Sequence, residues 1–135
     1  MLLEEDNYET FSFKKNERIT SKILLQNIIG KGTSLFIYPV KCYALFSSLN
    51  DVKPVNQMAV AVPKRIFKKA VDRNRVKRII REAYRLNNKQ ILLPLKTNGT
   101  KKISLLFVFV GKEIPDYKLI EKVMVDLLKK VLQLV

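Results

Sequence analysis

The chain has 135 residues, 47% of them hydrophobic, which suits one globular domain with a single core. Its 26 lysines and arginines outnumber 12 acids, and the net charge of +14 favours nucleic acid over an anionic membrane surface as partner. With no histidine, Ser-His-Asp and Cys-His catalytic sets are excluded, and a single cysteine excludes an internal disulfide or a cysteine-based zinc site.

The N-terminal segment is acidic. Four of the 12 acids lie in the first nine residues, and no basic region is followed by an apolar one, so a secretory signal is not expected. We expect residues 1–11 to be a flexible lead-in to one domain that covers 1–135. No apolar run reaches the roughly 18–20 residues of a membrane span, so a cytoplasmic protein is expected.

The next segments predict one helix followed by strands. Thr20 or Ser21 can cap a short helix that ends at the glycines of GKGTS. Its expected apolar stripe is Ile23, Leu24, Leu25, Ile28 and Ile29. β-branched and aromatic residues are frequent in Leu35–Ile37 and Val40–Phe46, which predicts a strand that begins near Pro39. A further strand is predicted at Gln57–Val62, and Pro63 ends it.

The second half predicts helix, strand and helix. A basic helix begins near Phe67–Asp72 and ends near Asn87–Asn88, and 93–102 form a loop. Ile103–Val110 is the most apolar run and is expected to be a central strand buried on both faces. Asp116 can cap a last helix that reaches about Leu132. The order α-β-β-β-α-β-α predicts an α+β two-layer sandwich.

The basic helix carries the strongest functional signal. Residues 64–85 hold ten lysines or arginines and two acids, which is +8 of the chain's +14. On a helix wheel Val76, Ile80 and Tyr84 share one arc, and the cations share the opposite arc. Burial of the apolar arc would hold the cations rigidly outward, where they suit a phosphate backbone. The alternative is a solvated charged surface, but few acids are spaced to compensate the repulsion.

A family resemblance rests on the same region. The strand Ala59–Val62 is followed by Pro63-Lys64-Arg65, and then by Arg73-Asn74-Arg75 and Lys77-Arg78. This arrangement resembles the protein subunit of bacterial ribonuclease P, and the similarity covers roughly residues 12–132. The resemblance implies a ribosomal-protein-like fold whose strand–helix–strand unit through the basic helix has a left-handed crossover, an exception to the usual rule.

The resemblance also implies a function. The protein would join a catalytic RNA, with one protein per RNA, and bind the 5′ leader of precursor tRNA, with no membrane or DNA partner. The holoenzyme, an endoribonuclease, would remove the leader by Mg²⁺-dependent hydrolysis to give the mature 5′ end. Mg²⁺ would be bound mainly by the RNA, so no catalytic or metal-binding residue is expected in the protein.

The resemblance places contacts with the catalytic RNA on the basic helix and on the turn before it. The residues are Lys64, Arg65, Lys68, Lys69, Arg73, Asn74, Arg75, Lys77, Arg78 and Arg81. Two alternatives stay open. Arg75 can instead form an ion pair with Glu82, and Lys68 and Lys69 can be solvated turn residues.

The resemblance also implies a cleft between the first helix and the sheet that guides the leader. Its expected residues are Lys14, Lys15, Arg18, Leu25, Ile29, Phe36 and Tyr43. Family members often carry aromatic residues on the inner face of the first helix, where this chain has Leu25 and Ile29, which cannot stack on a base. Tyr43 is then the main stacking candidate, while Phe36 and Phe13 can equally serve the core.

Two other functions remain possible at this stage. A structural RNA-binding protein of the ribosomal type could use the same scaffold without a processing role. A DNA-binding module is disfavoured, because the basic helix needs one side for the core and no helix-turn-helix partner precedes it.

Overall fold

The computed structural model describes residues 18–19, 22–48, 56–92 and 101–134. The elements, in chain order, are α2 (Lys22–Lys31), β1 (Thr33–Ile37), β2 (Val40–Ser48), β3 (Gln57–Ala61), α3 (Ala70–Ile91), β4 (Lys101–Phe109) and α5 (Tyr117–Gln133). This order confirms the α-β-β-β-α-β-α prediction and the α+β class. The predicted lead-in at 1–11 lies outside the described residues, as do the predicted helix caps Thr20 and Ser21.

The four strands form one mixed sheet in the order β1-β2-β4-β3. β1 and β2 form an antiparallel hairpin, β2 pairs antiparallel with β4, and β3 pairs parallel with β4. The prediction that the most apolar run forms a central strand is confirmed, because β4 has neighbours on both sides. The chain passes from β3 through α3 to the parallel β4, and the left-handedness of this crossover stays a prediction.

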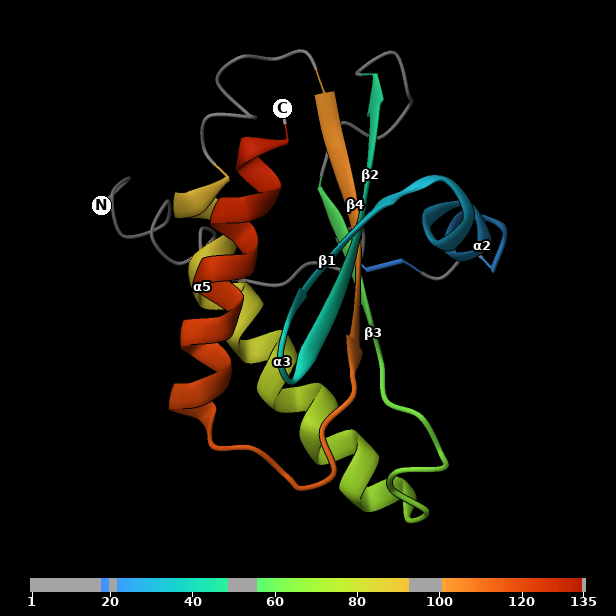
Figure 1. Ribbon diagram of the computed structural model, residues 1–135, viewed down its shortest axis with the longest axis vertical. Helices are drawn as coiled ribbons and strands as arrows, with labels where there is room; N and C mark the ends of the chain where they lie inside the picture. The colour runs from blue at the N-terminus through green and yellow to red at the C-terminus, as the bar shows by residue number, and fades with distance from the viewer. Residues whose placement is uncertain (1–17, 20–21, 49–55, 93–100, 135) are drawn as a thin grey trace, which may run out of the picture.

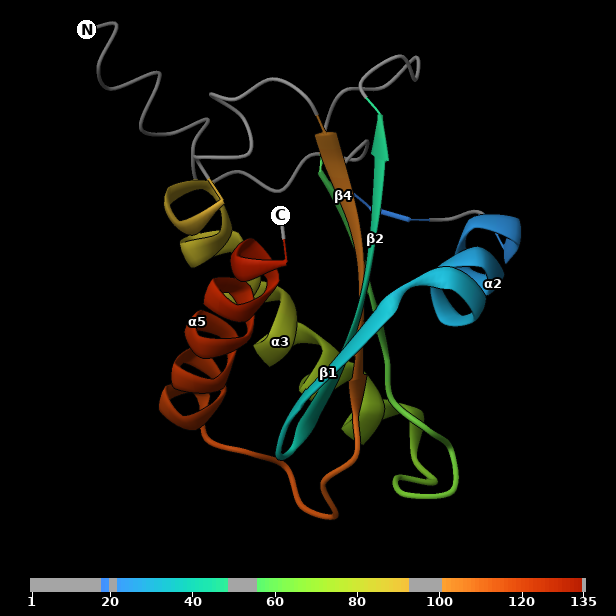
Figure 2. The same ribbon diagram turned by 45° about the horizontal axis from the view of Figure 1, so that its top comes forward.

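Helices cover both faces of the sheet. In Figures 1 and 2, α3 and α5 lie against one face and α2 lies against the other. Strand side chains alternate between the faces, so Leu105 and Phe107 join the large core under α3 and α5, whereas Leu106 packs with Ile28 of α2. The first helix therefore adds a partial third layer to the predicted two-layer sandwich.

The main core forms where α3 and α5 pack on the sheet. Their apolar stripes include Val76, Ile80 and Tyr84 of α3 and Leu127 of α5, all with no exposed surface. The ring of Tyr84 lies 5.8 Å from that of Phe107 in β4. This packing confirms the predicted apolar arc of the basic helix, and it fixes which side of α3 faces solvent.

Two details of the helices correct the predictions. The end of α3 at Asn87–Asn88 is wrong, because the helix continues to Ile91. Asn88 is buried, and its amide nitrogen donates to the Tyr84 carbonyl oxygen over 2.6 Å, so this residue stays within the helix. In α2 only Ile28 is fully buried, while Ile23 and Ile29 are exposed, so the predicted five-residue stripe is too wide.

Candidate nucleic-acid interface

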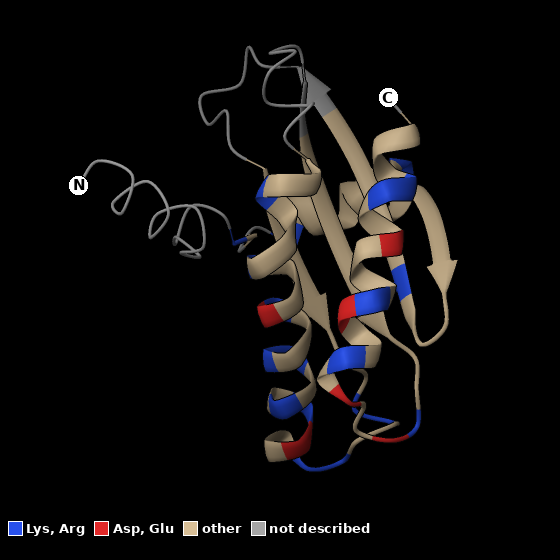
Figure 3. Ribbon diagram, turned by 90° about the vertical axis from the view of Figure 1, so that its left-hand side faces the viewer, with Lys and Arg blue, Asp and Glu red and all other residues tan. Residues whose placement is uncertain are grey.

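The outward side of α3 presents its polar residues in a fixed array. Asn74, Arg75 and Arg78 are exposed, and Lys77 and Arg81 are half-buried. The backbone of each is held by the buried stripe on the other side of the same helix, so binding requires ordering of the side chains but not of the backbone. Figure 3 shows lysine and arginine gathered over the N-terminal half of α3 and the loop before it.

The loop before α3 carries four more cations around a hydrophobic anchor. Backbone N–H groups of Ile66 and Phe67 donate to the Pro63 carbonyl oxygen over 3.2 and 3.4 Å. The Phe67 side chain is buried, with its ring 6.0 Å from that of Phe109. The exposed residues that this turn displays are Lys64, Arg65, Lys68 and Lys69. All the residues predicted to contact RNA therefore lie on α3 or on this anchored loop.

Arg73 differs from its neighbours because its side chain turns back onto the loop. Its Nη1 donates to the Phe67 carbonyl oxygen over 2.7 Å and to the Lys68 carbonyl oxygen over 2.9 Å. These bonds join the first turn of α3 to the preceding loop. Arg73 thus has a structural role that the sequence did not indicate.

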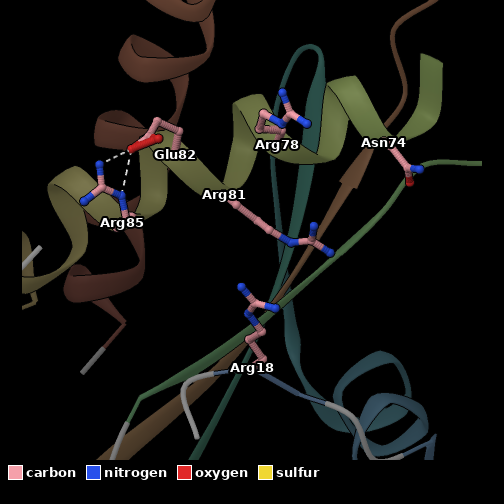
Figure 4. A pocket seen from close by; sticks show the side chains of 6 residues that line it. All are labelled: Arg18, Asn74, Arg78, Arg81, Glu82 and Arg85. Carbon is pink, nitrogen blue, oxygen red and sulfur yellow. Dashed lines mark hydrogen bonds and ion pairs between the residues drawn. The ribbon is translucent and has the colours of Figure 1, made fainter. Parts of the chain in front are cut away.

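The structure brings Arg18 to the α3 surface. Residue 18 forms a parallel bridge with Met58 of β3, and the Ile19 N–H donates to the Met58 carbonyl oxygen over 3.0 Å. An open groove of about 430 Å³ lies between this segment and α3. We call it the arginine groove, and Figure 4 shows its lining residues: Arg18, Asn74, Arg78, Arg81, Glu82 and Arg85.

Charge within the arginine groove is unbalanced. Arg85 Nε donates to Glu82 Oε1 over 2.7 Å, and the two side chains also form an ion pair. The alternative that pairs Glu82 with Arg75 is therefore wrong, because the carboxylate turns to the residue one turn further along α3. Counted over the described residues of the lining, four arginines and one glutamate give a net charge of +3.

Among the arginines of the groove, Arg81 has a pKa that its environment shifts. Partial burial lowers the pKa of its guanidinium below the usual value, and the positive charge of Arg18 lowers it further. The Arg81 guanidinium still carries its positive charge at neutral pH, because the usual pKa of arginine lies far above neutral. The protein thus keeps two like charges near each other at one groove.

On the opposite face of the sheet, the predicted cleft residues lie around α2. Tyr43 and Leu25 are both half-buried and pack against the small cluster around Ile28. Ile29 and Phe36 are both 55% exposed. Lys14 and Lys15 lie outside the described residues. Arg18, which was predicted in this cleft, instead lines the arginine groove.

Sequence reasoning missed Lys41 on this face. Its Nζ lies 5.0 Å from the centre of the Tyr43 ring, within cation–π range. Lys41 and Tyr43 are two residues apart on β2, and Phe36 pairs with Lys41 across the hairpin, so all three share a face. Because alternate residues of a strand share a face, the two-residue spacing between Lys41 and Tyr43 could have identified Lys41 from the sequence. A cation and two aromatic rings can contact both phosphate and base.

The described residues also limit other kinds of site. Within them, no helix is long and apolar enough to cross a membrane. Nor do they contain three or more histidine, cysteine, aspartate or glutamate side chains grouped to hold a metal ion.

The fold and the cationic side of α3 together define a small basic α+β protein whose rigid surface suits a polyanion. Known proteins of this kind match closely. The family model described as Ribonuclease P matches residues 13–132. The chain therefore belongs to the ribonuclease P protein family.

Individual relatives agree with this assignment. A "Ribonuclease P protein component" of Porphyromonas gingivalis is 35% identical over 85% of this chain and 82% of its own. One of Clostridium botulinum is 40% identical over 86% of this chain and 95% of its own. The solved ribonuclease P protein of Thermotoga maritima shares the fold, with a TM-score of 0.62 at 23% identity, covering 84% of this chain and 96% of its own.

Proposed function

We propose that this protein is the protein component of a ribonuclease P ribonucleoprotein. In this role it binds the catalytic RNA and the 5′ leader of precursor tRNA, and it promotes Mg²⁺-dependent endonucleolytic removal of the leader. The observation that carries the proposal is α3, whose buried stripe fixes an outward array of cations in a chain that belongs to this family. We expect the complex to be cytoplasmic, with one protein per RNA.

The physical contribution of α3 is electrostatic. Two RNA molecules that approach each other repel through their phosphates, and each phosphate that a lysine or arginine neutralises releases condensed counterions. Because the helix backbone is already ordered, the cost of binding is limited to the ordering of the side chains. The protein should therefore lower the Mg²⁺ concentration that the RNA needs, and the benefit should shrink at high salt.

Mg²⁺, bound mainly by the RNA, would supply the activated water and stabilise the leaving oxygen. The residues of this chain would bind and position RNA. Asn74, which is exposed in the Arg-Asn-Arg motif, can donate to a phosphate oxygen or accept from a water. Its amide can therefore add a hydrogen bond to RNA beside the contacts of the neighbouring arginines.

The face of the sheet around α2 is the proposed path of the leader. Tyr43 offers a ring for stacking, and Lys41 over that ring offers a cation for a backbone phosphate. Phe36 on the adjacent strand is exposed enough to take part. These three side chains on β1 and β2 could replace the aromatic residues that α2 lacks.

Reconstitution tests the proposal. Purified protein is mixed with bacterial ribonuclease P RNA and labelled precursor tRNA at a Mg²⁺ concentration where the RNA alone is nearly idle. Cleavage at the mature 5′ end that depends on the protein supports the proposal. Tight RNA binding without cleavage would contradict it and favour a structural RNA-binding role of the ribosomal type. Competition with duplex DNA separates RNA recognition from general polyanion binding.

A further inference from the structure

Two arginines that are 63 positions apart in the sequence meet in the arginine groove. Arg18 comes from the segment that pairs with β3, and Arg81 comes from the middle of α3. Figure 4 shows the two side chains extending toward each other across the groove. The resemblance assigned them to different surfaces, one to the leader cleft and one to the helix, but the structure gives them a common site.

Like charges held at a shared groove favour an anion between them. Placing the guanidinium groups together costs free energy in the folded protein, and a bound anion reverses that cost. Partial burial is the main reason that the pKa of Arg81 is lowered, and the positive charge of Arg18 lowers it further. Among the described residues that line the groove, Glu82 is the only carboxylate, and it accepts a hydrogen bond from Arg85.

The lining identifies the kind of anion. Guanidinium groups present planar pairs of N–H donors that match the oxygens of a phosphate, and the Asn74 amide adds a neutral donor. The volume of about 430 Å³ and the open mouth leave room for a phosphate that remains part of a chain. An isolated carboxylate ligand would use fewer of these donors.

We propose that Arg18 and Arg81 form one binding site for a single phosphodiester group, which joins the segment beside β3 to the cationic side of α3. Because both arginines contact the same phosphate, their contributions to binding are coupled. The identity of the RNA that supplies this phosphate rests on the proposed function. It is either the catalytic RNA or the precursor tRNA.

The first test needs no RNA and uses inorganic phosphate as the probe. Thermal unfolding of the full chain is followed in sodium phosphate and in sodium chloride at equal ionic strength and pH. A ligand that binds only the folded state raises Tm with concentration. The variant is Arg18→Gln/Arg81→Gln. The matched control, Lys129→Gln/Lys130→Gln, removes two charges from exposed positions on α5.

Phosphate also stabilises proteins by exclusion from their surface, so the control sets the background. We expect wild type and the control to show the same phosphate-dependent rise in Tm, and the arginine variant to show less than half of it. An equal phosphate-dependent rise in Tm in all three proteins would contradict the proposed phosphate site. This result does not depend on whether the protein serves ribonuclease P.

The second test measures affinity for RNA as a function of salt, with each single variant and the double variant. Each single substitution should weaken binding by about three- to tenfold, and the double by less than the product of the two. Loss of one phosphate contact lowers the slope of log K against log salt by about 0.7 to 0.9. The shared site would be overturned if the double variant changed the salt slope twice as much as each single variant and lost affinity by the product of the two single losses. That result would show two separate phosphate contacts.

Binding assays with different RNAs identify which RNA supplies the phosphate. Weaker binding to ribonuclease P RNA alone assigns the phosphate to the catalytic RNA. A loss seen only with precursor tRNA that carries a leader, and not with mature tRNA, assigns it to the leader. If wild-type protein fails to promote cleavage, the proposed function is contradicted, while the phosphate titration still decides the site.

Discussion

Arg73 donates a hydrogen bond of 2.7 Å to the carbonyl oxygen of Phe67, so the first arginine of the Arg-Asn-Arg motif holds the loop that precedes its own helix. Phe67 is in turn buried against Phe109 of the central strand. The cations of the loop are therefore positioned by the core through one aromatic anchor and one arginine. Removal of this arginine should affect folding and binding together.

Arg73→Ala should lower both the free energy of unfolding and the affinity for RNA. Two hydrogen bonds to backbone carbonyls are lost, at about 0.5–1.5 kcal/mol each. Urea unfolding and filter binding measure the two effects. Arg78→Ala is the control, because Arg78 is exposed and has no hydrogen bond within the described part of the chain. It should weaken binding and reduce the salt slope by about one unit, with unfolding unchanged.

Equal stability loss in both variants would contradict the structural role of Arg73. Unchanged RNA affinity in both would contradict the placement of the RNA interface on α3. Lys77→Ala, on the same side of the helix, should behave like Arg78→Ala in the salt titration.

Gly32→Ala should destabilise the protein by about 1–3 kcal/mol, in the range of an overpacked site. A Cβ at this position would lie 2.9 Å from the Ala44 carbonyl oxygen and would also clash with the Ile28 carbonyl oxygen. Gly30→Ala is the matched control, since a Cβ there meets nothing within 4 Å and Gly30 lies inside α2. It should stabilise the protein by about 0.5–1 kcal/mol. Urea titration of both variants measures the contrast, and a neutral Gly32→Ala would show that the α2–β1 connection can move away from Ala44 of β2.

Cys42 should be unreactive in the folded protein and should weaken the fold at alkaline pH. Burial raises the pKa of its thiol from 9.0 to about 12. Below pH 9 the thiol is protonated in both states, so its contribution to stability is fully present. Between pH 9 and 12 the unfolded chain releases this proton while the folded chain retains it, so stability falls as pH rises.

Labelling with a thiol reagent at pH 8 should therefore require unfolding, and Cys42→Ala should show a shallower loss of stability above pH 9. Tyr117, whose pKa is also raised to about 12 by burial and by its hydrogen bond to Glu121, adds to the alkaline slope in both proteins. Rapid labelling under native conditions would contradict the buried position of the thiol.

Tyr43→Leu should weaken binding of precursor tRNA by the reconstituted complex but leave mature tRNA unaffected. Stacking of a base on an aromatic ring contributes about 1–3 kcal/mol, which corresponds to a loss of about fivefold or more. Lys41→Gln should cause a smaller loss with the same dependence on the leader. Tyr38→Leu serves as the control, since Tyr38 is 64% exposed in the hairpin turn. Equal losses for precursor and mature tRNA would place Tyr43 outside the leader path.

Local patterns predicted the elements well because each pattern reflects a local cause. The alternation of apolar and basic residues in α3 identified its buried stripe, and the apolar run of β4 identified the central strand. Errors arose where residue type alone did not decide whether a side chain is buried or hydrogen-bonded. Asn88 suggested a helix end, yet its amide bonds within the helix, and the wide apolar set of α2 suggested burial of Ile23, which is 72% exposed.

The sequence by itself determined the basic helix, the order of elements, the absence of histidine and the motif of the family. Each depends on residue type and spacing along a short stretch of chain. Only the tertiary structure decided that Arg18 lines a groove with Arg81, that Arg73 holds the preceding loop, and that Lys41 lies over Tyr43. The first of these depends on the pairing of the segment at 18–19 with β3, which brings distant residues together and which no helical or strand period encodes.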